Sequence, residues 1–235
     1  MLLIRINSRY DKNHLLKVIL DIFLLSMKRS SKSIFRYIQA DTGTIKTKVN
    51  VPDNPQAVVI ICDDKEQGEN LTRNELVSQI FMKENYLTLQ ILNEEVVCNA
   101  EQLLPSLLKW LSATNEFKNL PVFIFCSGRS ANNIFKTILI EKLNISAIAI
   151  RSGIIELSPK ELNKINIPVL LLTADGDYEL LDKNNKLLGQ VNNNFRMRII
   201  SNSTRYFVEL GKLGYVLFLT IEWFRNCLHR KALSI

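Results

Sequence analysis

The chain has 235 residues, of which 47% are hydrophobic, and it contains 8 glycines and 6 prolines. This is enough for one ordinary domain core, and it excludes a disordered, collagen-like or low-complexity chain. The chain has 30 basic and 23 acidic residues, and residues 1–48 hold ten of the basic and three of the acidic ones. The whole excess of seven charges therefore lies at the N-terminal end, and any acidic partner is expected to meet that end.

Residues 1–44 are predicted to be a basic arm that contains an amphipathic helix. Apolar side chains between residues 15 and 27 recur at helical spacing, with Lys17 and Asp21 among them. The run is too short to cross a membrane, and it lacks the cleavage site of a secretory signal. Three interpretations stay open: the helix packs on its own domain or a partner protein, it lies on a membrane surface, or translation begins at Met27.

Residues 45–235 are predicted to form one domain in which strands and helices alternate. Continuous apolar runs, rich in β-branched residues, predict strands at 57–62, 86–91, 121–126, 146–150, 168–173 and, more weakly, 196–200. Helical periodicity lies between them, at 71–83, 100–112, 131–143 and 211–229. This alternation predicts an α/β fold with a doubly wound, mostly parallel sheet, helices on both faces and no large lid.

In such a sheet, ligands bind beyond the carboxyl ends of the strands. The loops expected to form the site are therefore those at 63–68, 127–130, 151–156 and 174–177. We expect no cofactor and no metal ion. The charge-balanced domain also lacks the basic and aromatic pattern of a nucleic-acid-binding surface, so no nucleic acid is expected there.

Cysteine and histidine limit the chemistry that this domain can perform. The four cysteines are Cys62, Cys98, Cys126 and Cys227, and no C-x-x-C spacing occurs among them. Three of the four lie at or near apolar runs. Reduced core cysteines and a cytoplasmic protein are therefore predicted. The two histidines, His14 and His229, lie near opposite ends of the chain. A mechanism that needs a histidine base within the domain has almost no candidate.

From about residue 45 to residue 228, the order of these segments resembles the α/β-hydrolases of the dienelactone-hydrolase type. The matching segments are AVVIICDDKEQGENLTRNELVSQIF, LPVFIFCSGRSANNIF, AIAIRSG, IPVLLLTADGD and IEWFRNCL. The resemblance implies an α/β-hydrolase fold and a Ser–His–Asp triad. The serine of that triad lies in a G-x-S-x-G turn between a strand and a helix, where backbone N–H groups stabilise the oxyanion.

The turn departs from the family pattern. Laid over G-x-S-x-G, residues 126–130 place Gly128 at the nucleophile position, which leaves no side-chain oxygen there. A shift of two residues brings Ser130 to this position but replaces the last glycine of the motif with Asn132. Ser127, or Cys126 with a thiolate stabilised by Arg129, are further candidate nucleophiles.

The other catalytic positions are also altered. Asp177 matches the family's catalytic acid, although it could instead cap a following helix. Arg205 occupies the position of the family's catalytic histidine, and an arginine cannot deprotonate to act as a base. The family's His-Gly pair after the first buried strand reads Asp63-Asp64, whose charge would oppose an oxyanion. The resemblance therefore implies a degenerate triad.

The favoured hypothesis is a non-catalytic α/β-hydrolase-fold protein, a pseudo-hydrolase that serves as a binding or interaction module. Its pocket is expected to accept a small anionic ligand at the rim, and the arm is expected to contact a membrane surface or a protein. The residues expected to bind the ligand are Asp63, Asp64, Arg129, Arg151 and Arg205.

Two alternatives place an active enzyme on the same fold. The first is a carboxylic-ester or dienelactone-type hydrolase with Ser130 as an unorthodox nucleophile and Asp177 beside it. The second is magnesium-dependent phosphoryl chemistry at Asp63-Asp64 and at Asp175 and Asp177, which is similar to the acidic pocket of receiver domains.

Overall fold

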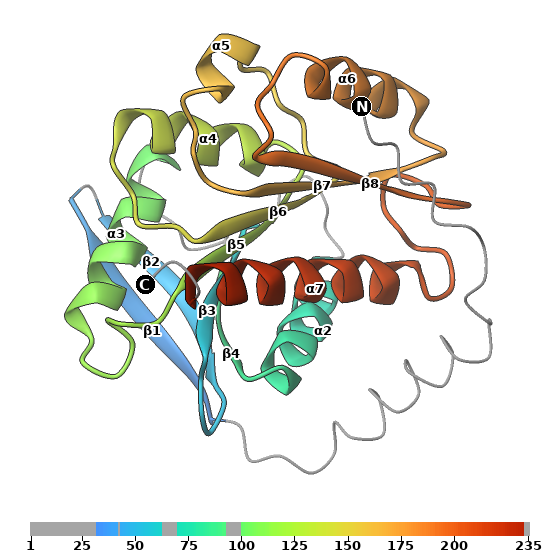
Figure 1. Cartoon of the computed structure of the whole chain (residues 1–235). Helices are drawn as coiled ribbons and strands as arrows, with labels where there is room; N and C mark the ends of the chain where they lie inside the picture. The colour runs from blue at the N-terminus through green and yellow to red at the C-terminus, as the bar shows by residue number, and fades with distance from the viewer. Residues whose placement is uncertain (1–31, 42, 63–69, 93–99, 233–235) are drawn as a thin grey trace.

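The computed structural model describes residues 32–41, 43–62, 70–92 and 100–232, which form an eight-stranded sheet with helices on both faces (Figure 1). The strand order is β1-β2-β4-β3-β5-β6-β7-β8. The first two strands pair antiparallel to each other, β2 pairs antiparallel to β4, and all other pairs are parallel. The prediction of a doubly wound, mostly parallel α/β sheet is confirmed.

The strands are β1 (Lys32–Ala40), β2 (Gly43–Val51), β3 (Ala57–Cys62), β4 (Tyr86–Ile91), β5 (Val122–Ser127), β6 (Ala147–Arg151), β7 (Val169–Ala174) and β8 (Phe195–Ile200). The helices are α2 (Asn70–Lys83), α3 (Ala100–Ala113), α4 (Ser130–Ile140), α5 (Pro159–Leu162), α6 (Tyr178–Leu188) and α7 (Lys212–Ala232). Each of the six predicted strands lies within one residue of the observed one, because every residue of β3 to β7 is buried and apolar runs mark such strands well.

Alternate side chains of the parallel strands feed two separate cores. On one face, Ile60, Ile124 and Ile148 pack with residues of α3, α4 and α5. On the other face, α2 and α7 cover a core rich in aromatic rings, in which Phe123 stacks on Phe224 with ring centroids 4.4 Å apart. Figure 1 shows α2 and α7 together on one side of the sheet and α3 to α6 on the other. The two layers hold the carboxyl ends of β3, β5, β6 and β7 at a common edge.

The first hairpin was not predicted as part of the sheet. Each residue of β1 from Lys32 to Ala40 pairs with a residue of β2, so residues 32–40, which were predicted to belong to the arm, form a strand of the sheet. These strands escaped the sequence pattern because their side chains alternate between burial and exposure, while the apolar runs mark only strands buried on both faces.

The amphipathic segment of the predicted arm lies outside the described residues. Among the helices that the structure describes, none is both long and apolar enough to cross a membrane. Cys62 and Cys126 are buried, as expected of reduced core cysteines, and Cys227 is partly buried.

Candidate functional site

The turn between β5 and α4 has the backbone geometry of a nucleophile turn but no nucleophile at its apex. Gly128 follows the last residue of β5 and has a φ of 55°, in the left-handed region that favours glycine. Arg129 returns to right-handed helical geometry and leads into α4. A strained strand-to-helix turn is the feature that exposes the serine of G-x-S-x-G motifs. This geometry favours the alignment that puts Gly128, with no side chain, at the nucleophile position.

Ser130 lies at the first residue of α4, and its hydroxyl is held by backbone groups. The Oγ atom donates to the carbonyl oxygens of Ser127 at 2.5 Å and Cys62 at 3.0 Å, and it accepts from the N–H of Ser127 at 3.3 Å. Because a hydroxyl has one proton, the two carbonyl groups share it. In this structure Ser130 therefore ties the end of β5 to the end of β3. Its role as a nucleophile stays a prediction.

The other two candidate nucleophiles of the turn are buried. Ser127 is 4% exposed and Cys126 is 1% exposed. Cys126 lies in the interior of β5, with its side chain in the core that α3 and α4 cover. A buried thiol in apolar surroundings is inert, because the thiolate is the reactive species and burial disfavours it.

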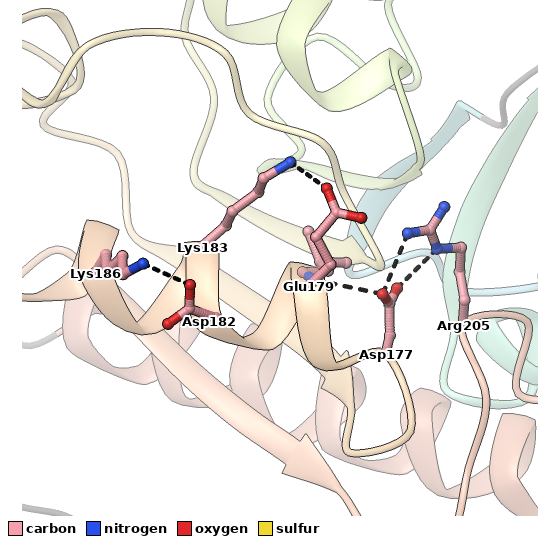
Figure 2. Close-up of polar contacts among 7 residues, drawn as sticks. Asp177, Glu179, Asp182, Lys183, Lys186 and Arg205 are labelled. Carbon is pink, nitrogen blue, oxygen red and sulfur yellow. Dashed lines mark hydrogen bonds and ion pairs between the residues drawn. The ribbon is translucent and has the colours of Figure 1, made fainter.

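Asp177 and Arg205 form a bidentate ion pair at the carboxyl ends of β7 and β8 (Figure 2). The Nε atom of Arg205 donates to Oδ2 of Asp177 at 2.7 Å, and Nη2 donates to Oδ1 at 3.1 Å. The Asp177 side chain is 8% exposed, whereas that of Arg205 is 42% exposed. The hydrogen bond to Asp177 raises the pKa of Arg205 above its ordinary value, so the guanidinium stays charged.

Asp177 has a second task, at the start of α6. Its Oδ1 also accepts from the backbone N–H of Leu180 at 3.4 Å, which makes Asp177 the N-cap of that helix. Both carboxylate oxygens are thus occupied, one by the guanidinium alone and the other by the guanidinium and the helix. This geometry agrees with the alternative expectation that Asp177 caps the following helix.

The loop that carries Arg205 is fixed by side chains from neighbouring strand ends. Asp175 accepts hydrogen bonds from the backbone N–H groups of Asn202 at 2.9 Å and Ser203 at 3.2 Å. Ser152, at the end of β6, donates from Oγ to the carbonyl oxygen of Arg205 at 2.8 Å. Ser152 and Asn202 have φ values of 46° and 51°, which are costly for residues other than glycine. Arg205 is therefore placed by a constrained backbone rather than by its ion pair alone.

Sequence reasoning did not identify Ser152 or assign Asp175 a structural role. The RSG motif pointed to the right loop, and its glycine has a packing reason. A Cβ atom on Gly153 would lie 2.0 Å from Cγ2 of Ile150 and 3.1 Å from Cβ of Ala131. Any larger residue here would force the Ile150 side chain to move and would crowd Ala131 at the start of α4.

The predicted rim arginines occupy different environments. Arg129 is exposed beside Gly128, and Arg205 is ion-paired. Arg151 is 3% exposed, so its side chain is buried rather than solvent-facing, and its role in ligand binding stays a prediction. As the last residue of β6 it lies between Ser127 of β5 and Leu172 of β7, and both neighbouring strands limit its access to solvent. The sequence pattern marks the strand end but not the depth of the side chain.

The acidic residues of the magnesium hypothesis are only partly described. Asp63 and Asp64 lie outside the described residues. Asp175 accepts two backbone N–H groups and Asp177 accepts a guanidinium and a helix N–H, so both carboxylates are committed to the protein. In the described part of the chain, no group of three or more His, Cys, Asp or Glu residues could hold a metal ion.

The fold is shared with solved hydrolases. A dienelactone hydrolase from Anabaena variabilis superposes with a TM-score of 0.74 and 19% sequence identity, covering 83% of this chain and 98% of that one. The chain has the α/β-hydrolase fold. An α/β serine hydrolase homologue from Coxiella burnetii has a TM-score of 0.66 and 14% identity, covering 80% of this chain and 96% of its own. The predicted dienelactone-hydrolase-like fold is thus confirmed.

Sequence comparison adds one distant similarity. No protein-family model matches the chain. A Mycobacterium tuberculosis protein, curated in two strains and provisionally named a phosphoribosyl transferase, is 22% identical over 187 residues. The match covers 75% of this chain but 42% of the relative. Since this chain spans less than half of that protein, the transferase name describes a longer molecule.

Proposed function

We propose that this chain is a non-catalytic α/β-hydrolase-fold protein that acts as a binding or interaction module. One observation carries the proposal. Asp177 and Arg205 form a bidentate ion pair at the positions that the hydrolase resemblance assigns to the catalytic acid and histidine. A catalytic histidine must accept a proton from the nucleophile, and a charged guanidinium has no lone pair with which to do so.

Two further observations support the loss of catalysis. Gly128, with its left-handed backbone, supplies no oxygen at the apex of the turn. His229, the histidine within the described residues, is exposed near the end of α7, beyond the aromatic core rather than on the loop of Arg205. The nucleophile and the base are therefore altered independently, and restoring one of them would not restore a triad.

The first experiment tests for residual activity. The full chain is incubated with p-nitrophenyl acetate and with a fluorophosphonate probe, beside a Ser130→Ala variant. We expect no hydrolysis above that of the variant and no labelling. Labelling that maps to Ser130 or Ser127, together with turnover lost in Ser130→Ala, would overturn the proposal in favour of an ester hydrolase.

A second experiment tests whether the positions are assigned correctly. The Gly128→Ser/Arg205→His double variant reinstates both missing groups, and Asp177 is already present to orient the new imidazole. We expect fluorophosphonate labelling at position 128 in the double variant and much less in either single variant. A folded double variant that reacts no better than the parent protein would contradict the assignment of these two positions.

The ligand class that we propose for this module is a small anion. Arg205 has five N–H donors, of which the ion pair uses two, and Arg129 is exposed beside Gly128. Phosphate and small carboxylates are therefore expected to raise the melting temperature of the full chain, and less so for an Arg129→Ala variant. Equal shifts of the melting temperature in both proteins would show that Arg129 does not take part in anion binding.

A further inference from the structure

On one face of the β1–β2 hairpin, the part along β1 is left uncovered by the described helices, while α2 contacts β2 at Lys48 and Asn50. Along β1, Ile34 and Ile38 turn toward the side of the sheet that α3 covers. The alternate side chains turn to the opposite side and are exposed, with Phe35 at 56% and Tyr37 at 61% of full exposure. Since β1 is the edge strand, neither its outer edge nor this face is covered by another element of the described chain.

The uncovered surface combines aromatic rings with lysines, and we call it the hairpin face: Phe35, Tyr37, Lys46 and Lys48. The register pairs Phe35 with Lys48 and Tyr37 with Lys46, so all four side chains share one side of the hairpin. The Nζ atom of Lys46 lies 5.9 Å from the ring centroid of Phe35 and 5.8 Å from that of Tyr37. Lys48 forms an ion pair with Glu75 of α2, which fixes the inner boundary of the face.

The hairpin face has the spacing of a stacking platform. Residues two apart on a strand are about 7 Å apart, roughly twice the thickness of a stacked base, so each ring can receive a base of its own. The remaining side chains on this side of β1 are Ser33 and Gln39, which are polar. Within the described hairpin, Phe35 and Tyr37 are the large apolar side chains on this face, and the other side chains are polar, so the face is less apolar than the inserted face of a membrane-surface helix.

Charge also favours a polyanion. Residues 32–51 contain four basic residues and one acidic residue, Asp41, and two of the basic residues, Lys46 and Lys48, lie on the hairpin face. The hairpin belongs to the N-terminal end that carries the whole excess charge of the protein. The predicted boundary between the arm and the domain, at residue 45, separated the aromatic residues of β1 from the lysines of β2. The pattern therefore becomes visible only when the two strands are paired.

We propose that the hairpin face binds single-stranded nucleic acid, with bases stacked on Phe35 and Tyr37. The phosphates lie near Lys46, whose side chain shares this face with the two rings. Base stacking on exposed aromatic rings and backbone contacts from basic side chains are the two components of sequence-tolerant single-strand binding. This inference uses residues remote in sequence from Gly128, Asp177 and Arg205, and it stands whether or not the protein is catalytic.

The test measures fluorescence anisotropy of short fluorescein-labelled oligothymidylate and oligouridylate with the full chain. We expect the Phe35→Ala/Tyr37→Ala variant to bind at least about 30-fold more weakly, from the loss of two stacking contacts. A Lys46→Ala variant should lower the salt dependence of binding by about one counterion. The matched control is Tyr178→Ala/Tyr206→Ala, which removes two exposed rings elsewhere and should bind as the parent does.

A second measurement separates stacking from simple charge attraction. An oligonucleotide that contains 2-aminopurine should lose fluorescence on binding to the parent chain but not to the Phe35→Ala/Tyr37→Ala variant. Three outcomes would overturn the proposal: no binding by the full chain, equal binding by the double variant, or binding to phosphatidylserine vesicles that depends on the two rings without any binding of oligonucleotide. The last outcome would assign the face to a membrane surface instead.

Discussion

The turn after β5 and the corner between β7 and β8 depart from the triad of the hydrolase resemblance in different ways. At the turn, the backbone keeps the left-handed conformation of a nucleophile position, and the side chain is missing at Gly128. At the corner, the acid is present and hydrogen-bonded, but its partner is Arg205 instead of an imidazole. One region preserves a conformation without its functional group, and the other preserves a charged interaction without a titratable base.

This difference indicates which forces maintain each region. The turn connects two buried elements, and Ser130 holds it to β3 through backbone hydrogen bonds, so its shape contributes to the core. The corner contains a carboxylate with an 8% exposed side chain, and a buried charge needs a partner whether or not catalysis is required. An arginine satisfies that electrostatic need as well as a histidine would. Fold stability can therefore preserve both regions without activity.

The largest effect is expected at the corner. Arg205→Ala leaves the buried carboxylate of Asp177 without its guanidinium, and we expect the free energy of unfolding to fall by about 1–3 kcal/mol. This loss is smaller than the loss expected for a fully buried ion pair, because Arg205 is partly exposed to solvent. Urea denaturation measures this change. Lys183→Ala breaks an exposed pair with Glu179 on α6 and should leave the free energy of unfolding nearly unchanged, because solvent screens this pair. Equal losses in the two variants would show that the corner pair is an ordinary surface interaction.

The turn should respond to a side chain at its apex. Gly128→Ala introduces a Cβ atom at a φ of 55°, and we expect a loss of about 1–2 kcal/mol in unfolding free energy. Urea denaturation of Gly128→Ala and Gly128→Asn provides the comparison, because asparagine tolerates left-handed backbone better than alanine does. If alanine is as stable as glycine, the turn is not strained in the way the structure indicates.

Loss of the Ser130 hydroxyl should have a smaller effect. Ser130→Ala removes the link between β5 and β3, and a net hydrogen-bond contribution predicts a loss of about 1 kcal/mol in stability. Thermal and urea unfolding measure the loss, and Ser158→Ala at the exposed cap of α5 is the comparison. No destabilisation together with lost esterase turnover would instead make Ser130 a catalytic group.

Tyr86 provides a reference remote from both regions. Its hydroxyl is buried without a hydrogen-bond partner among the described residues, and burial raises the pKa of Tyr86 to about 12. Tyr86→Phe is therefore expected to change stability by no more than about 0.5 kcal/mol at neutral pH, and it can be stabilising. In the parent, the unfolded tyrosine ionises first, so stability should fall between about pH 10 and pH 12. Tyr86→Phe should weaken that fall; an unchanged pH profile would contradict the raised pKa.

Much of the fold was predictable because local sequence controls it. Continuous apolar runs placed β3 to β7 within a residue, since a strand buried on both faces can contain little else. The helix α6 and the first hairpin were missed, because many of their side chains are polar and exposed, so neither contains a continuous apolar run. At the site, order and spacing drew attention to Asp177, Gly128 and Arg205, and the structure brings the acid and the arginine together. Their functional roles stay predictions. The depth of Arg151 was not predicted, because strand ends look alike in sequence.

By itself, the sequence determined the fold class and the absence of a histidine where a triad needs one, since composition and apolar runs do not depend on long-range contacts. The tertiary structure decided the rest. It paired Asp177 with Arg205 across 28 residues, buried Arg151 between two strands, and joined the aromatic side chains of β1 to the lysines of β2 on one face. These contacts join residues that are far apart in sequence. They form only when strand pairing and helix packing bring the strand ends together, so local sequence patterns do not reveal them.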